Sequence, residues 1–110
     1  MKHLKYYKNL KKPEIGDYVI CSEDFEECKE FIENNIGQIV MINPKFSVCK
    51  YLVKYENIPS HIREFFTDLY GQTTKDTQIA YRPMNNYDFL IIDKDINNIK
   101  LKLASKKYNI

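Results

Sequence analysis

The chain has 110 residues, of which 44% are hydrophobic and 29% are charged. These proportions are typical of one globular domain, and no segment approaches the roughly 18 consecutive apolar residues that predict a membrane-spanning helix. The formal net charge of +2 is too small to indicate a protein that is basic or acidic as a whole.

Charge is distributed unevenly along the chain. Residues 1–12 hold five lysines and no acid, whereas residues 13–35 hold eight acids and a single lysine. Residues 93–110 are basic again, with five lysines against two aspartates. We therefore expect a basic N-terminal arm at residues 1–12, followed by one domain at residues 13–110.

The first predicted elements are a strand and a helix. Residues 15–21 form an apolar run that is entered through a turn at Gly16, which predicts a strand. Asp24 and Glu27 have the spacing of a capping box, and acids crowd the first turn of a helix predicted over residues 24–35. The apolar face of this helix consists of Phe25, Cys28 and Ile32.

A β-hairpin is predicted next. Residues 39–42 and 50–56 are rich in Ile, Val and Tyr, and they flank a turn-forming Asn-Pro-Lys at residues 43–45. The first strand is apolar on both faces, so we expect both faces to be covered, either by this chain or by another subunit. The second strand alternates and places three residues on one face: Tyr51, Val53 and Tyr55.

Another helix, two strands and a C-terminal helix complete the prediction. Ser60 begins a helix that Gly71 ends, and its apolar stripe consists of Ile62, Phe65, Phe66 and Leu69. Residues 77–82 and 87–92 are predicted strands, and Pro83 ends the first of them. Asp93 or Asp95 caps a C-terminal helix that turns three residues inward: Ile96, Ile99 and Leu103.

This order of elements predicts an α+β fold. Five short strands, with short helices inserted between the first and second and between the third and fourth, suit a small bent antiparallel sheet. Closing the sheet into a barrel removes its exposed edges, so we expect a five-stranded antiparallel barrel with inserted short helices and a C-terminal helix.

The order of three short motifs resembles that of SH3-like small barrels. Residues 16–20 (Gly-Asp-Tyr-Val-Ile) are similar to the start of their first strand, residues 36–40 (Ile-Gly-Gln-Ile-Val) to the second and residues 51–56 (Tyr-Leu-Val-Lys-Tyr-Glu) to the third. The resemblance covers residues 13–92 and is nearest in character to small SH3-like barrel proteins of phages and other viruses. The predicted helix at residues 24–35 departs from the pattern, because such barrels often have a loop there.

The sequence has no motif that is typical of catalysis. Its three glycines form no phosphate-binding loop, and neither G-x-S-x-G nor H-E-x-x-H occurs. The spacings of Cys21, Cys28 and Cys49 match no zinc module, and no local signature pairs His3 or His61 with a thiol. We predict no enzymatic activity, no metal and no cofactor. The odd number of cysteines favours a reducing compartment, namely the cytoplasm, or the host cytoplasm if the protein is viral.

An acidic helix and an aromatic barrel face are the candidate binding surfaces. The acids between residues 23 and 33 are denser than solubility requires, although a solvated helix face is the simpler interpretation. Most of the tyrosines in or beside the strands are expected to contribute to the core, with their hydroxyls reaching its rim. A subset of them, together with Arg82, is expected to form an exposed groove for a peptide or other extended ligand. We therefore expect a protein–protein interaction module, plausible as a phage accessory or host-modulating protein. The candidate binding residues are Glu23, Glu26, Glu27, Glu30, Tyr55, Tyr81, Arg82 and Tyr87.

A barrel that binds nucleic acid is the alternative hypothesis. The lysines of residues 1–12 suit a phosphate backbone, and Tyr6 and Tyr7 among them suit stacking on bases. The small net charge and the acidic segment oppose this hypothesis, because the acids repel a duplex.

Overall fold

A computed structural model of the protein describes residues 12–108. The predicted basic arm at residues 1–12 therefore lies, apart from Lys12, outside the described residues. The described part contains five strands, two α-helices and two 3-10 helices. In chain order they are β1 (Tyr18–Cys21), α2 (Glu26–Glu33), β2 (Gly37–Ile42), β3 (Tyr51–Tyr55), η1 (Ser60–Phe65), β4 (Ala80–Met84), η2 (Asn86–Asp88), β5 (Phe89–Asp93) and α3 (Ile96–Tyr108).

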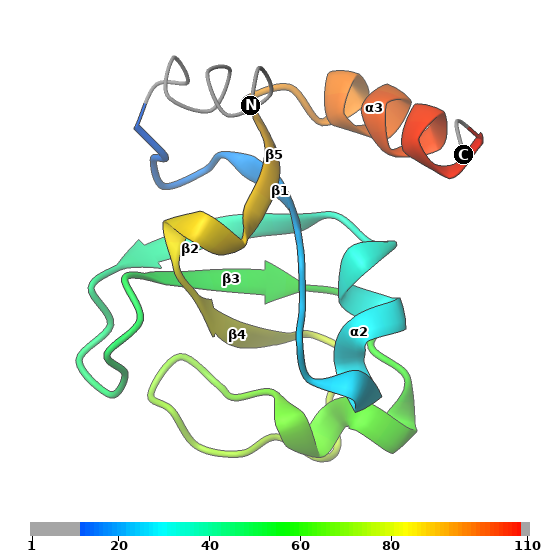
Figure 1. Cartoon of the computed structure of the whole chain (residues 1–110). Coiled ribbons are helices and arrows are strands. Elements are labelled where there is room, and N and C mark those ends of the chain that lie inside the picture. Colours follow the sequence, from blue (N-terminus) through cyan, green and yellow to red (C-terminus); the bar gives the residue numbers. More distant parts are fainter. Residues whose placement is uncertain (1–11, 109–110) are drawn as a thin grey trace.

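The five strands form one antiparallel sheet in the order β4-β3-β2-β1-β5. A register shift between Ile39 and Met41 marks a bulge in β2, and bulges bend a sheet and increase its twist. Figure 1 shows the result, with β1 and β5 running across the direction of β2 and β3. Strands β4 and β5 are the two edges of the sheet, which is open between them. The five-stranded antiparallel sheet and the C-terminal helix are confirmed, whereas the barrel predicted from sequence is not closed.

The main hydrophobic core lies between the sheet and the segments that carry α2 and η1. Tyr51, Val53 and Tyr55 of β3 share one face, as the alternation predicts, and this face points into the core, where the three are at most 2% exposed. Helix α2 contributes Cys28 and Ile32, both fully buried. Burying a side chain of the size of Ile32 stabilises the fold by roughly 1.5–3 kcal/mol, so this face attaches α2 firmly to the sheet.

A second, smaller core holds α3 against the other side of β1. It consists of Ile20, Ile99 and Leu103, all at most 8% exposed, as predicted for the inner face of the C-terminal helix. The Asp95 carboxylate accepts a hydrogen bond from the Asn97 N–H at 2.8 Å, which satisfies one of the free donors at the start of α3. Figure 1 shows α3 at the end of the molecule where β1 and β5 meet.

Two predicted helices differ from those observed. Helix α2 begins at Glu26, and Asp24 makes no cap, because the N-cap position is occupied by Phe25. The Glu23 carboxylate instead accepts the Phe25 N–H at 2.9 Å. The helix predicted from Ser60 to Gly71 is the 3-10 helix η1 and ends at Phe65. Beyond it the chain turns into a loop, in which Gly71 adopts a φ of 91°.

The strand predicted over residues 77–82 is displaced along the chain. Strand β4 runs through Pro83 to Met84. Proline lacks the N–H that an interior strand must donate, but β4 is an edge of the sheet, where that donor is not needed. The last strand is similarly shifted, because Asn86–Asp88 forms η2 before β5 begins.

No helix within residues 12–108 is long and apolar enough to cross a membrane.

Candidate functional site

Glu23 and Arg82 form an ion pair that connects the start of α2 to β4. The Arg82 guanidinium donates to both carboxylate oxygens of Glu23, from Nε at 2.8 Å and from a terminal nitrogen at 2.9 Å. Its other terminal nitrogen donates to the Phe65 carbonyl at 2.8 Å. The guanidinium also lies over the rings of Phe25 and Phe66, at 5.9 and 5.8 Å. One side chain thus contacts the segment before α2, the end of η1 and the core.

The Arg82 side chain is committed to this internal pair. Burial opposes its charge, but the hydrogen bonds and the charge of Glu23 outweigh that penalty and raise the pKa of Arg82. The two side chains are only 17% and 10% exposed. Arg82 and Glu23 were predicted as members of two separate binding surfaces, and the structure brings them together as a structural pair.

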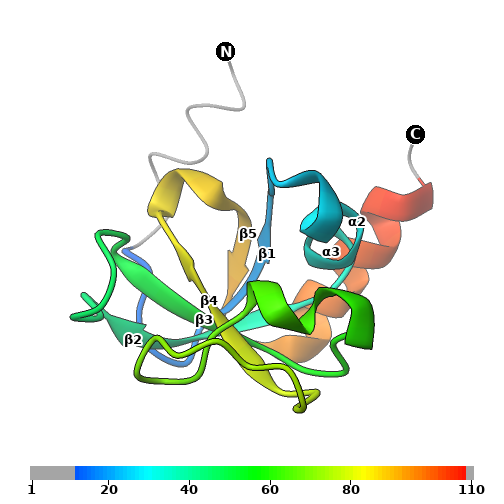
Figure 2. The same ribbon diagram turned by 90° about the horizontal axis from the view of Figure 1, so that it is seen from below.

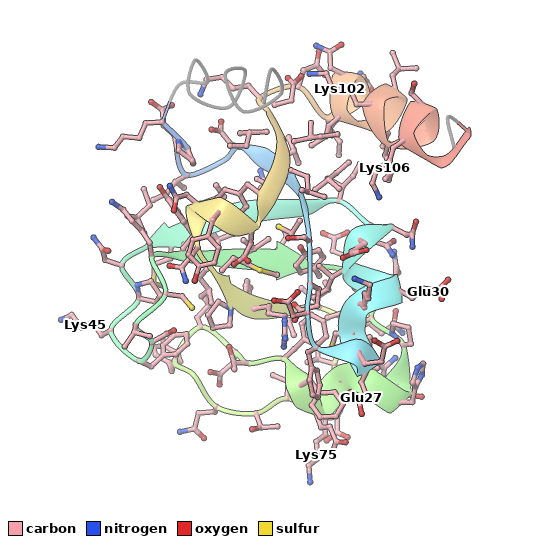
Figure 3. All side chains as sticks on the ribbon, viewed as in Figure 1. Glu27, Glu30, Lys45, Lys75, Lys102 and Lys106 are labelled. Atoms are coloured by element: carbon pink, nitrogen blue, oxygen red, sulfur yellow. The ribbon has the colours of Figure 1, made fainter. Side chains whose placement is uncertain are left out.

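The outward face of α2 carries three exposed carboxylates, those of Glu26, Glu27 and Glu30. None of the three forms an ion pair within the described part of the chain. The only lysine of the helix, Lys29, pairs with Glu33 at 3.2 Å. Figure 3 shows Glu27 and Glu30 pointing outward from α2. The acidic field that the sequence predicts is therefore present at the surface without neutralisation by neighbouring described side chains.

A groove of about 350 Å³ separates α2 from η1. Figure 2 shows the two helices side by side, η1 in green and α2 in cyan. Two of the predicted binding residues, Glu27 and Glu30, line it together with the half-buried Phe31. Ile62 also lies along it but is only 1% exposed. The remaining lining residues are Asn34, Asn35, Pro59 and His61. Sequence reasoning did not identify residues 59–62 as part of this groove. Nothing in their spacing places them opposite α2.

The predicted aromatic face is not assembled at the surface. Tyr55 is a core residue with no exposed area, so its assignment to an exposed groove is wrong. Tyr81 is half-buried on β4. Tyr87 is 77% exposed and lies on η2, where its hydroxyl accepts a hydrogen bond from the Asn85 side chain at 3.0 Å. The three tyrosines therefore occupy separate environments.

A pair of phenylalanines beside the groove was also missed. Phe25, directly before α2, and Phe65, at the end of η1, meet edge to face with their ring centroids 4.8 Å apart. Phe25 is 40% exposed. The two rings join the segment before α2 to the end of η1, which Arg82 also links by its bonds to Glu23 and to the Phe65 carbonyl, so the spacing between α2 and η1 is fixed by packing as well as by charge.

The thiols are dispersed. Cys21 and Cys28 are buried in the core, and Cys49 is half-buried in the loop before β3. Burial raises the pKa of the Cys21 thiol to about 12. Within residues 12–108, no group of three or more His, Cys, Asp and Glu side chains is arranged to hold a metal ion.

Comparison of the chain with protein-family models, with curated proteins and with solved structures found no match.

Proposed function

We propose that this protein is a non-catalytic protein-interaction module that binds a lysine- or arginine-bearing segment of its partner in the groove between α2 and η1. The observation that carries the proposal is the groove of about 350 Å³ with Glu27 and Glu30 in its lining, neither of which forms an ion pair with a described residue. Carboxylates beside the half-buried Phe31 ring suit a long cationic side chain, because Lys and Arg lay their methylene stems on apolar surface and keep the charged head in water.

The expected affinity is modest. Exposed ion pairs contribute roughly 0.2–1 kcal/mol each and are screened by salt. Uncompensated charge on Glu26, Glu27 and Glu30 therefore favours rapid, steered association with a basic partner more than tight binding. The partner gains further affinity only if its backbone or apolar groups also contact Phe31 or Pro59, which line the groove and are half-buried.

We further propose that the domain is a small SH3-like barrel of the phage or viral type, and that it acts as an accessory protein. The last strand, β5, returns to pair with the first, β1, which also pairs with β2, although the sheet stays open between β4 and β5. This pairing and the motif resemblance of residues 16–20, 36–40 and 51–56 support the assignment. An acidic helix in place of the first long loop gives such a barrel a binding surface of its own.

Nucleic-acid binding through the lysine arm is the second candidate function. The five lysines of residues 1–12 are the observation in its favour. The exposed carboxylates of α2 oppose it, because they repel phosphate from one side of the domain. The two functions make opposite predictions for the same titration.

The experiment is an NMR titration of the ¹⁵N-labelled full-length chain with a short oligoarginine peptide, an oligoglutamate peptide and single-stranded DNA. We expect oligoarginine alone to shift the amides of α2 and η1 saturably at low salt. The variant E26K/E27K/E30K is expected to lose those shifts. Asp76→Lys reverses the charge of an exposed acid outside the groove; it is the control for the position of the charge and is expected to keep them.

Two results would overturn the proposal. Equal binding of oligoarginine by wild type and by E26K/E27K/E30K would remove the acidic helix as the site. Shifts produced by single-stranded DNA, lost on deletion of residues 1–12 and absent with oligoarginine, would put the second candidate in its place.

A further inference from the structure

A second hollow lies on the opposite side of the sheet from the main core. It is a cleft of about 550 Å³ between β1, β2, β3 and the first turns of α3. Strand register fixes one wall, because Tyr18 is paired with Gln38, and Gln38 with Lys54. These three side chains stand in one row across adjacent strands, which are about 4.8 Å apart. Lys100 of α3, one helical turn after Ile96, faces the row.

The chemistry of this cleft differs from that of the groove beside α2. Two lysines line it, Lys54 and Lys100, against one carboxylate, that of Glu56. Lys54 pairs with Glu56 at 3.4 Å, and the Glu56 side chain is 56% exposed. Lys100 forms no ion pair with any described residue. The cleft therefore offers an anion one available ammonium group and a second held by a weak surface pair.

Three carboxamides in the lining add hydrogen-bonding groups, and two of them are held in place. The Asn35 side chain donates to the Phe31 carbonyl at 2.8 Å, and the Gln38 side chain donates to the Gly16 carbonyl at 3.1 Å. Each of these amides keeps its own carbonyl oxygen and one N–H for a ligand. The third, Asn57, follows β3 in a left-handed conformation with a φ of 57°. Polar groups fixed in this way confer orientation and specificity on a ligand site.

We propose that the cleft binds a small phosphorylated ligand of the nucleoside-phosphate class. Lys54 and Lys100 take the phosphate as point charges. The half-buried Tyr18 ring supplies a surface for a base, and carboxamides are the side chains that pair with the edge of adenine. A volume of about 550 Å³ lies within the ordinary range of small-ligand sites. The proposal goes beyond the α2 groove and does not depend on it.

The test is a titration of the ¹⁵N-labelled full-length chain with ADP, AMP, adenosine and inorganic phosphate, each up to about 1 mM. We expect ADP to shift the backbone amides of Gly37, Gln38 and Asn57 and the side-chain amides of Asn35 and Gln38 in a saturable way. Adenosine and phosphate alone are expected to bind more weakly than ADP, because each provides only part of the contacts.

Variants separate this cleft from general attraction of anions by lysines. Lys100→Glu is expected to weaken ADP binding about tenfold or more, because it removes one charge-assisted contact and adds a repulsive charge. Lys45→Glu is the matched control and is expected to leave the affinity unchanged, since Figure 3 shows Lys45 at the tip of the β2–β3 loop, far from α3. Both lysines are exposed, so neither variant is expected to unfold the domain.

Several outcomes would overturn the proposal. The first is the absence of saturable shifts with ADP, and the second is a loss of ADP binding in Lys45→Glu equal to that in Lys100→Glu. The others are adenosine binding as tight as that of ADP, and tighter binding of a short oligothymidylate than of ADP. Loss of oligoarginine binding in E26K/E27K/E30K has no bearing on this site, so the two proposals fail separately.

Discussion

The carboxylate of Glu23 accepts two hydrogen bonds from the guanidinium of Arg82, although the two residues are 59 positions apart in the chain. The same carboxylate accepts the Phe25 N–H ahead of α2, and the same guanidinium donates to the Phe65 carbonyl at the end of η1. Both walls of the groove therefore depend on one ion pair. Because planar, two-point pairs are directional, this pair sets the position of α2 as well as contributing to stability.

We expect Glu23→Gln to lower the free energy of unfolding by about 2–3 kcal/mol. The variant leaves the Arg82 guanidinium largely buried without a counter-charge, and the residual exposure of the pair keeps the cost below that of a fully buried one. Arg82→Lys keeps the charge but not the fork geometry, so it is expected to retain only part of the stability. Urea denaturation measures both changes.

Glu56→Gln is the control for the loss of one carboxylate. Glu56 pairs with Lys54 at 3.4 Å but is 56% exposed, so its loss is expected to cost less than about 0.5 kcal/mol. If Glu23→Gln were no more costly than Glu56→Gln, the pair would not be the link between α2 and β4 that the geometry indicates.

We expect Tyr55→Phe to stabilise the protein or to leave it unchanged. The Tyr55 hydroxyl is buried and makes no well-formed hydrogen bond with any described residue. The Cys21 thiol beside it is only a weak hydrogen-bonding group. Burying an unpaired hydroxyl costs roughly 1–3 kcal/mol, and the phenylalanine ring keeps the contacts with Phe31 and Phe66. Tyr51→Phe is the comparison. The hydroxyl of Tyr51, unlike that of Tyr55, is not both buried and without a partner. A loss of more than about 1 kcal/mol in Tyr55→Phe alone would mean that the hydroxyl is hydrogen-bonded after all.

Local features of the sequence predict much of the fold. β-branched and aromatic runs located β1, β2 and β3, and the spacing of Cys28 and Ile32 located the buried face of α2. These features arise where one face of a strand or helix packs on the core. Apolar residues then recur in the sequence with the period of that strand or helix. The sequence placed β4 too early in the chain, because proline ordinarily ends a strand. Pro83 is tolerated inside β4 only because β4 is an edge of the sheet.

The candidate site was less predictable, because it depends on contacts between distant segments. The acids in and before α2 are evident in the sequence, but nothing local shows that Glu23 is taken up by Arg82, 59 residues away, while Glu27 stays exposed. Pro59 and His61 enter the groove because η1 folds across α2, which no spacing records. Tyr55 was assigned to the surface because alternation gives the face of a strand but not what covers that face.

We expect Gly37→Ala to destabilise the protein by about 2 kcal/mol or more. An added Cβ at Gly37 would lie 2.8 Å from the Tyr55 ring and closer still to Val53, both of which are core side chains. Overpacking of this kind costs about 1–3 kcal/mol even where the backbone conformation suits alanine. Thermal or urea denaturation measures the change.

Gly16→Ala separates steric overlap from backbone strain. Gly16 has a φ of 99°, but an added Cβ meets no atom within 4 Å, so only the strain of about 1 kcal/mol is expected. A smaller loss in Gly37→Ala than in Gly16→Ala would show that β2 and β3 move apart easily at this point, contrary to the close approach of Gly37 to the core.

The stability of the protein is expected to fall at alkaline pH. Burial raises the pKa of the Cys21 thiol from its ordinary value of 9.0 to about 12. Above pH 9 the unfolded chain therefore releases a proton that the folded chain keeps, so the free energy of unfolding falls as the pH rises from 9 toward 12. Each group of this kind contributes at most about 1.4 kcal/mol per pH unit. Burial also raises the pKa of Tyr55, which adds a loss of the same sign at higher pH.

Urea denaturation between pH 8 and pH 11, at intervals of about half a unit, measures this slope. Cys21→Ala removes the titrating thiol, so its stability is expected to be lower at pH 8, because a cavity is left, but to fall less steeply above pH 9. Cys49→Ala, which leaves the buried thiol in place, is expected to keep the wild-type slope. A slope in Cys21→Ala equal to that of the wild type would mean that the Cys21 thiol ionises as readily in the folded protein as in the unfolded chain. Its burial in the main core opposes this.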